Sequence, residues 1–330
     1  MRPHLRSVRP LMLALSVVGS LALAACSSSD DASQGAPADV GSADDGSAVD
    51  EDAGPRTIEH AMGSTEVPAE PERVVVLDSS FLDSSIALGV TPVGATEGIA
   101  GAGLPAYLGD DVEDVELVGL TEEPTLEEVA ALAPDLIIGA KVRHQDIYEQ
   151  LSAIAPTVFS ESSGTNWQDQ VRLTGEALGR SDEAEQLLAD VESRAAEVGE
   201  QVGAADMTAT IVRFIPGQIR LYGPGTFSGS VLESVGFDLG DKGYDEQYGM
   251  AVISQERLDL IDADVVFATN PGEESAGRIS TDREAAGPLW EQLPAVVDGR
   301  QHDIADSTWM TGIGVLGANR ILDDVESMLG

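Results

Sequence analysis

The longest amphipathic stretch of the chain, residues 181–203, constrains the fold more than any other feature. Apolar residues recur there every three or four positions and form one stripe of a helix. Ser181 can cap the start of this helix, and Gly203 is suited to end it. At 1.5 Å per residue the helix would be about 34 Å long, which is the width of a small domain. Because strand-like runs lie on both sides of it, we expect two lobes joined by one long helix.

Short β-branched runs alternate with amphipathic stretches outside this helix, which is typical of α/β folds. We expect strands over residues 74–77, 92–95, 136–138, 157–159, 210–214 and 265–268, and further helices over 80–88, 125–132, 144–154 and 167–178. The expected domains are an N-terminal α/β lobe over 56–178, an interlobe helix over 179–204 and a C-terminal α/β lobe over 205–330. Since a single long helix resists hinge bending, we expect a ligand to move the lobes only modestly.

A weak internal similarity agrees with two lobes. Glu127 and Glu256 each begin a short helical pattern, and an Asp eight residues later, Asp135 or Asp264, leads into a buried strand. Chance likeness between two α/β units is the alternative.

The first 25 residues have the pattern of a signal peptide, with three arginines, an apolar run over residues 11–23 and a small-residue pair at 24–25. The apolar run is too short for a comfortable membrane span. The next residue is Cys26, the only cysteine of the chain. Residues 23–26 resemble a bacterial lipobox, in which the cysteine is lipidated and becomes the new N-terminus. An unused thiol is the alternative, because a lone cysteine forms no internal disulfide.

Acidic residues outnumber basic ones, with 58 Asp and Glu against 18 Lys and Arg and a net charge of −40. This balance argues against nucleic acid and anionic membrane surfaces as partners, because phosphate binding needs clustered Lys and Arg. A strongly solvated surface and life at high salt both fit it. Residues 27–54 hold eight acids and no base. We therefore expect a disordered acidic tether over 26–55.

Catalytic and metal-binding signatures are scarce in this sequence. Neither a G-x-S-x-G nor a G-x-x-x-x-G-K-[ST] segment occurs. Residues 312–317 match G-x-G-x-x-G, but they follow no convincing strand and lie 13 residues from the C-terminus, so close helix packing is favoured over a dinucleotide site. His60, His144 and His302 have no partner at metal-ligand spacing, and we expect surface or turn positions for them. The sequence thus predicts a binding module, with no catalytic and no metal-binding residue.

The scarce positive charge is concentrated just after one expected strand. Lys141 and Arg143 follow the strand at 136–138, with His144 beside them. Ligands of α/β proteins bind beyond the carboxyl ends of the strands, and the planar guanidinium of arginine suits carboxylates and polarised oxygens. We therefore expect Arg143 to face a ligand. The alternative is that Arg143 pairs with an acid on the neighbouring helix.

These features together resemble a substrate-binding lipoprotein of an iron-siderophore ABC importer, in the helical-linker class (class III) of the periplasmic-binding-protein fold. The resemblance covers nearly all of residues 56–330. It rests on the runs 133–138, 141–158, 213–230 and 307–309.

The resemblance implies that the chain captures a ferric siderophore, of hydroxamate or citrate type, on the outer face of the cell membrane. It implies delivery to an ABC permease dimer, a monomeric protein, and membrane contact through the lipid anchor only. No cofactor is implied, because the oxygens of a siderophore already fill the coordination sphere of iron. The same fold binding haem, a corrinoid or ferric citrate is the alternative, and a zinc or manganese carrier is a more distant one.

The resemblance also implies site residues. The expected ligand-binding residues are Lys141, Arg143, Arg213, Arg220, Tyr222, Arg278 and Trp309. Arg143→Ala should then weaken ligand binding with little change in thermal stability. For Arg213 a solvent-facing or interlobe ion pair is the alternative, and for Trp309 it is plain core packing. Glu127 and Glu256 match the glutamates that contact permease arginines in the family, although acids at helix starts are also favoured by the helix dipole.

Overall fold

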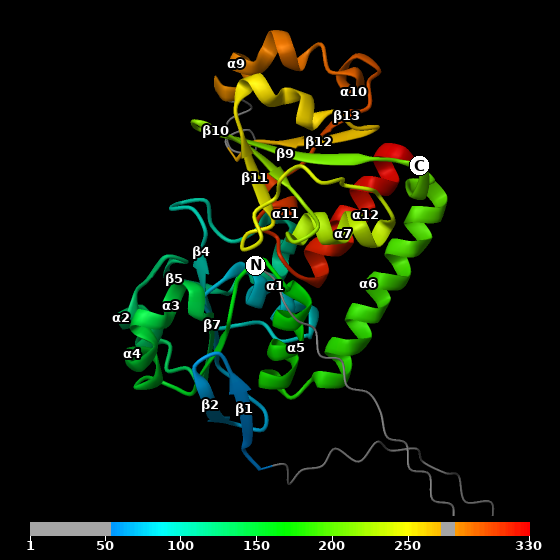
Figure 1. The fold of residues 1–330 in the computed structure, drawn as a ribbon. Coiled ribbons are helices and arrows are strands. Elements are labelled where there is room, and N and C mark those ends of the chain that lie inside the picture. Colours follow the sequence, from blue (N-terminus) through cyan, green and yellow to red (C-terminus); the bar gives the residue numbers. More distant parts are fainter. Residues whose placement is uncertain (1–53, 272–280) are drawn as a thin grey trace, which may run out of the picture. The chain divides into compact units, whose positions relative to one another are not determined.

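The structure is a computed structural model that describes residues 54–271 and 281–330. Its N-terminal lobe contains a six-stranded sheet in the order β6-β5-β4-β3-β7-β8, in which only the β5–β6 pair is antiparallel (Figure 1). The strands are β3 (Val74–Val76), β4 (Gly94–Glu97), β5 (Glu116–Leu120), β6 (Glu123–Pro124), β7 (Leu136–Ala140) and β8 (Thr157–Ser160). An antiparallel hairpin of β1 (Arg56–His60) and β2 (Gly63–Val67) precedes the sheet.

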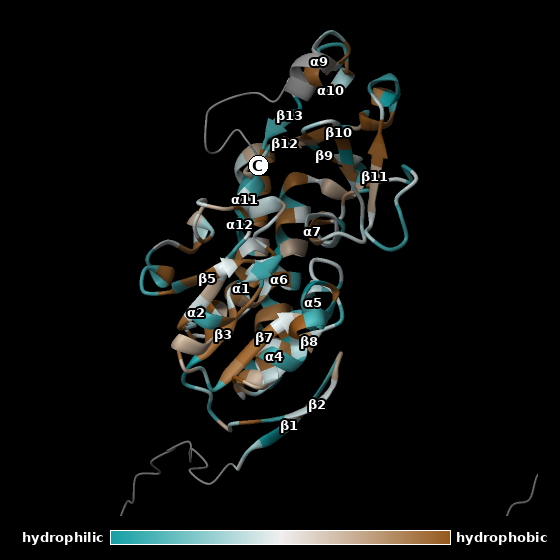
Figure 2. Cartoon of the chain, turned by 90° about the vertical axis from the view of Figure 1, so that its left-hand side faces the viewer, coloured by the Kyte–Doolittle hydropathy of each residue, from teal (hydrophilic) through white to brown (hydrophobic). Residues whose placement is uncertain are grey.

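Helices cover both faces of this sheet. They are α1 (Ser79–Ala87), α2 (Leu126–Ala131), α3 (Lys141–His144), α4 (Tyr148–Ser152) and α5 (Trp167–Leu178), with the 3-10 helices η1 (Ala106–Val112) and η2 (Gln145–Ile147). Successive residues of β3 point to opposite faces: Val74 and Val76 pack in the core that includes α1 and α5, and Val75 packs in the core that includes α2 and α4. Strands buried on both faces read as continuous apolar runs, and β3 and β7 have that hydropathy (Figure 2).

The C-terminal lobe contains a five-stranded sheet in the order β11-β10-β9-β12-β13. The strands are β9 (Ala209–Ile215), β10 (Gln218–Tyr222), β11 (Met250–Ile253), β12 (Val265–Thr269) and β13 (Gln301–Asp303). Strand β12 is parallel to β9 and β13, whereas β10 is antiparallel to both of its neighbours. The helices are α7 (Phe227–Val235), α9 (Thr281–Trp290), α10 (Pro294–Val297), α11 (Asp306–Trp309) and α12 (Val315–Leu329), with the 3-10 helices η3 (Ala204–Asp206) and η4 (Gln255–Ile261).

Helix α6 (Ser181–Val202) connects the two lobes (Figure 1). Its buried residues, among them Ala184, Val191 and Ala195, belong to one apolar core that also takes in α1 and α5 of the first lobe and α7 and α12 of the second. The predicted architecture of two α/β lobes and one long helix is confirmed. Gly203 ends the helix in the left-handed conformation, with φ 72°, but the N-cap is Arg180 rather than Ser181.

The internal similarity corresponds to an equivalent contact in each lobe. The Asp135 carboxylate before β7 accepts backbone N–H groups of Glu72 and Arg73, which precede β3. The Asp264 carboxylate before β12 accepts the backbone N–H and the hydroxyl of Thr208, which precedes β9. In both lobes an Asp therefore ties together the starts of two adjacent parallel strands.

One buried carboxylate lies where α1 meets the N-terminus of α12. Asp83 of α1 accepts the backbone N–H groups of Leu316 and Gly317, each at 2.9 Å, and the hydroxyl of Tyr107 at 2.8 Å. The glycine-rich stretch 312–317 therefore serves close packing, as expected: a Cβ on Gly314 would lie 2.2 Å from an Asp83 oxygen. Burial raises the pKa of the Asp83 carboxyl to about 6, although these hydrogen bonds oppose the shift.

This pKa predicts a pH dependence of stability. Because the Asp83 pKa is higher in the folded protein than in the unfolded chain, Asp83 stabilises the fold fully below about pH 4, and this contribution is lost as the pH rises through about 6. The loss is at most about 3 kcal/mol. Urea unfolding of the wild type and of Asp83→Asn between pH 4 and 7.5 measures it: the difference between their unfolding free energies should shrink as the pH rises. A difference that stays constant with pH would contradict the raised pKa.

Candidate functional site

A cavity of about 560 Å³ lies between the two lobes, a size typical of small-molecule sites. The N-terminal lobe contributes the start of α3 and the loop 161–165, and the C-terminal lobe contributes β10 and the segments 226–228, 247–250 and 309–313. Five of the seven expected ligand-binding residues line it: Lys141, Arg143, Arg220, Tyr222 and Trp309.

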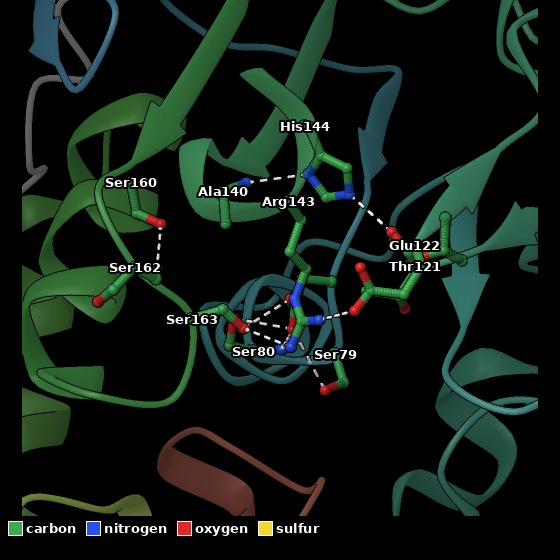
Figure 3. Close-up of polar contacts among 12 residues, drawn as sticks. Ser79, Ser80, Thr121, Glu122, Ala140, Arg143, His144, Ser160, Ser162 and Ser163 are labelled. Carbon is green, nitrogen blue, oxygen red and sulfur yellow. Dashed lines mark hydrogen bonds and ion pairs between the residues drawn. The ribbon is translucent and has the colours of Figure 1, made fainter. Parts of the chain in front are cut away.

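The basic cluster is held by a buried histidine. Helix α3 begins directly after β7, so Lys141 and Arg143 lie at the carboxyl end of that strand. Nδ1 of His144 accepts the backbone N–H of Ala140, and Nε2 donates to the carbonyl of Thr121 at 2.7 Å (Figure 3). These contacts require a neutral ring, and burial lowers the His144 pKa accordingly. The expectation of a surface or turn histidine is wrong here, because the ring fastens α3 to the neighbouring loop.

Arg143 lines the cavity and is bound to two acids at the same time. Its Nε donates to Asp78 at 2.9 Å. Another nitrogen donates to Glu122, as Figure 3 shows. Asp78 is only 4% exposed and also accepts the backbone N–H of Ser80 as the N-cap of α1. The Ser163 hydroxyl donates to the same carboxylate at 2.7 Å. Arg143 thus lines the cavity, as expected, and also pairs with an acid at the start of a neighbouring helix, which was the alternative.

Lys141, two residues earlier, has a different environment. Its ammonium group pairs with Glu161 at 2.9 Å, and the Glu161 side chain is 73% exposed. Both partners line the rim of the cavity, so this pair is open to solvent and to a ligand.

The C-terminal lobe presents a second pair of expected residues. Arg220 and Tyr222 alternate along β10 and both reach the cavity. Arg220 donates to Gln218 at 2.9 Å and has no carboxylate partner among residues 54–271 and 281–330. It is therefore the cavity arginine whose charge is least compensated.

Arg213, which was expected to bind the ligand, is not among the residues that line the cavity. It stands opposite Arg220 in the β9–β10 register, but two of its nitrogens donate to the Asp306 carboxylate at 2.7 and 2.6 Å. Its third nitrogen is 3.4 Å from the hydroxyl of Tyr222. Arg213 can thus orient Tyr222, and its ion pair lies within the C-terminal lobe.

Trp309 lies both at the cavity, as expected for a ligand-binding residue, and in the core, which was the alternative. It contributes to the cavity wall, yet the residue is fully buried, with its ring 4.9 Å from that of Phe267. Its indole N–H donates to Asp324 at 2.8 Å. Arg278 lies outside the described residues.

Sequence reasoning missed the apolar part of the lining. Phe227, Tyr248, Met250, Met310 and Ile313 all face the cavity. Tyr248 is 52% exposed, and the Asp245 carboxylate accepts its backbone N–H. An Asp three residues before a tyrosine, followed by glycine, is a turn signal that could have drawn attention to it.

The three histidines do not come together. His60 bonds Thr65 in the first hairpin, His144 ends α3 and bonds the carbonyl of Thr121, and His302 packs against Phe267 in the other lobe. In the part of the chain that the structure describes, no group of three or more His, Cys, Asp and Glu side chains is placed to hold a metal ion.

The buried pairing changes what we expect of Arg143→Ala. The substitution leaves the Asp78 carboxylate without its cation, so it should lower the free energy of unfolding by about 1–3 kcal/mol rather than leave stability unchanged. Lys141→Ala is the matched control, because its exposed ion pair is worth about 0–1 kcal/mol. Urea unfolding of the ligand-free variants compares the two. Equal losses would show that the Asp78 pairing adds nothing.

Comparisons with known proteins agree with this geometry. Residues 74–306 match the family model described as periplasmic binding protein. The probable siderophore-binding lipoprotein YfiY of Bacillus subtilis is 37% identical over 282 residues, covering 82% of this chain and 87% of that protein. The Fe(3+)-citrate-binding protein YfmC of the same organism is 31% identical, covering 85% and 88%. The crystal structure of Staphylococcus aureus SirA complexed with staphyloferrin B matches with a TM-score of 0.73 and 31% identity, covering 83% of this chain and 98% of SirA. The chain therefore belongs to the periplasmic binding protein family, as the resemblance in its sequence indicated.

Proposed function

We propose that this protein captures a ferric siderophore outside the cytoplasmic membrane and delivers it to an ABC importer, without catalysing a reaction. One observation carries the proposal: the interlobe cavity joins cations from both lobes, Arg143 and Arg220, to an apolar and aromatic lining. An iron complex whose organic ligand already supplies the oxygens needs such a site, because it asks the protein for charge and shape rather than for metal ligands. The names of YfiY and of the SirA complex support the same ligand class.

Within that class we propose a carboxylate-bearing siderophore, of citrate type. The guanidinium of Arg220 lacks a carboxylate partner among the described residues, and a planar guanidinium binds a carboxylate through two parallel hydrogen bonds. The name of YfmC, a relative at 31% identity, refers to ferric citrate.

Tryptophan fluorescence tests ligand and site together, since Trp309 forms part of the cavity wall. Ferric citrate and ferric siderophores should quench it, while iron-free siderophores, haem and cyanocobalamin should not. Arg220→Gln should weaken binding about 10- to 100-fold, the effect of losing hydrogen bonds to a charged group. Arg257→Gln is the matched control, because Arg257 is an exposed arginine of the same lobe that pairs with Asp259. Binding of haem alone, or equal affinity of the two variants, would overturn the assignment.

We propose that Cys26 carries the lipid anchor. Cys26 lies outside the described residues, and the proposal rests on the lipobox-like residues 23–26 and on relatives named as lipoproteins. Among the residues that the structure describes, no helix is long and apolar enough to cross a membrane. Cys26→Ser should therefore move the protein from the membrane fraction to the soluble fraction, because the acyl chains would be its only membrane attachment. A variant that stays with the membranes would refute the anchor.

We propose Glu127 and Glu256 as the contacts with the permease. Both side chains are exposed, one in the first turn of α2 and one in the first turn of η4, in the two segments that the internal similarity relates. Exposed acids on both lobes can pair with arginines on two permease subunits.

Replacing both glutamates by alanine should abolish iron-siderophore uptake by cells while the purified protein keeps its ligand affinity. The double variant Glu128→Ala with Asp259→Ala removes neighbouring acids of the same two helices and should leave uptake unchanged. If the Glu128→Ala, Asp259→Ala variant lost uptake and the variant without Glu127 and Glu256 kept it, the proposed docking residues would be wrong.

A further inference from the structure

Helix α1 contacts the binding cavity at one end and the other lobe along its length. Its N-cap, Asp78, holds Arg143 of the cavity wall. Ser79 donates from its hydroxyl to the carbonyl of Thr311 at 2.7 Å. Asp83, four residues further along the helix, accepts the backbone N–H groups of Leu316 and Gly317. One short helix therefore holds both the N-terminal side of the cavity and the segment that leads into α12.

The N-terminus of α12 is shaped to receive that carboxylate. Gly314 occupies the N-cap position and has no side chain to cap the helix, so Asp83 bonds the amides that an N-cap side chain would otherwise bond. A Cβ on Gly312 would lie 2.7 Å from the ring of Tyr107, and one on Gly314 would meet Asp83 itself. Gly312 and Gly314 thus admit groups of the opposite lobe, and the anion at this helix terminus is the protein's own.

The segment between α11 and α12 also forms part of the cavity. Met310 and Ile313 line it, and they lie on either side of Thr311, whose carbonyl receives the hydroxyl of Ser79. A shift of α12 relative to α1 would move these two side chains with respect to Arg143. The contact between Asp83 of α1 and the N-terminus of α12 therefore affects the width of the cavity directly.

A buried carboxylate adds little net stability, but its hydrogen bonds restrict the geometry of the groups around it. Removing Asp83 from water costs free energy, as its raised pKa reflects. Its three donors converge from two lobes within 2.9 Å, and a displaced lobe would leave the carboxylate buried with fewer of them. Such a contact permits one interlobe arrangement and penalises its neighbours.

We propose that Asp83 is a positioning residue for ligand binding, which sets the separation of the two lobes by docking into the glycine-rich N-terminus of α12. The effect on ligand affinity rests on the proposed function, whereas the effect on lobe separation does not.

Three variants of the full chain test the proposal. Asp83→Asn keeps the size of the side chain but replaces one of the two carboxylate oxygens by an NH2 group. That donor would then face a backbone N–H of α12 instead of accepting it. Tyr107→Phe keeps the carboxylate and removes one of its donors, and it serves as the milder variant if Asp83→Asn does not fold. Ser85→Ala is the matched control, because Ser85 is a buried residue of α1 whose hydroxyl has no hydrogen-bond partner among the residues that the structure describes.

The primary measurement is the distance between spin labels on the two lobes in the ligand-free protein, at positions 149 and 255 in a Cys26→Ser background. Asp83→Asn should broaden the distance distribution or shift it, Tyr107→Phe should do so less, and Ser85→Ala should match the wild type. Ferric citrate, used as the probe, should bind at least about tenfold more weakly to Asp83→Asn. An unchanged distance distribution in both Asp83→Asn and Tyr107→Phe would overturn the proposal, whatever happens to affinity. A changed distribution in a protein whose wild type binds no ferric complex would uphold it and refute the proposed function instead.

Discussion

The ion pair between Asp78 and Arg143 is the contact on which the rest of the site depends. Asp78 follows β3 closely and Arg143 follows β7, and these strands are parallel neighbours, with Val76 paired to Ile138. Strand pairing thus brings together two groups that lie 65 residues apart in the sequence. Because Asp78 also caps α1, the same carboxylate fixes the direction of that helix and the position of the cavity arginine. The site is therefore built into the sheet rather than added to its loops.

The electrostatics of the cavity differ between its two walls. On the N-terminal wall Arg143 and Lys141 are matched by Asp78, Glu122 and Glu161. A ligand that reaches Arg143 shares it with Asp78 and Glu122, so a simple anion gains little there. On the C-terminal wall Arg220 has no carboxylate partner in the described part of the chain. In a chain with a net charge of −40, this arginine is a local attraction for an anionic ligand.

The sequence predicted what short-range patterns encode and missed what long-range pairing creates. The 3.6-residue period of α6, the apolar runs of β3 and β7 and the basic cluster after β7 all lie within single segments, and all were recognised. Strands β10 and β11 were not, because they take their places by pairing with neighbours rather than by a strong period of their own. The expected helix over 144–154 is instead η2 and α4, which follow the end of α3 at His144, and the side chain of His144 bonds the distant carbonyl of Thr121. The partners of Arg143 and the carboxylate that meets Gly314 have no local sequence signal either.

The separation of 233 residues between Asp83 and Leu316 has a consequence for how the chain folds. Chains emerge from the ribosome N-terminus first, so the first lobe is complete in sequence long before α12 exists. Until the last helix arrives, the Asp83 carboxylate lacks its two backbone donors. Pairings of such high contact order form late and slowly. Helix α12 carries both donors in its first turn and thus completes a contact whose other half lies in α1. A chain that ended before Val315 would leave the Asp83 carboxylate of the N-terminal lobe without Leu316 and Gly317.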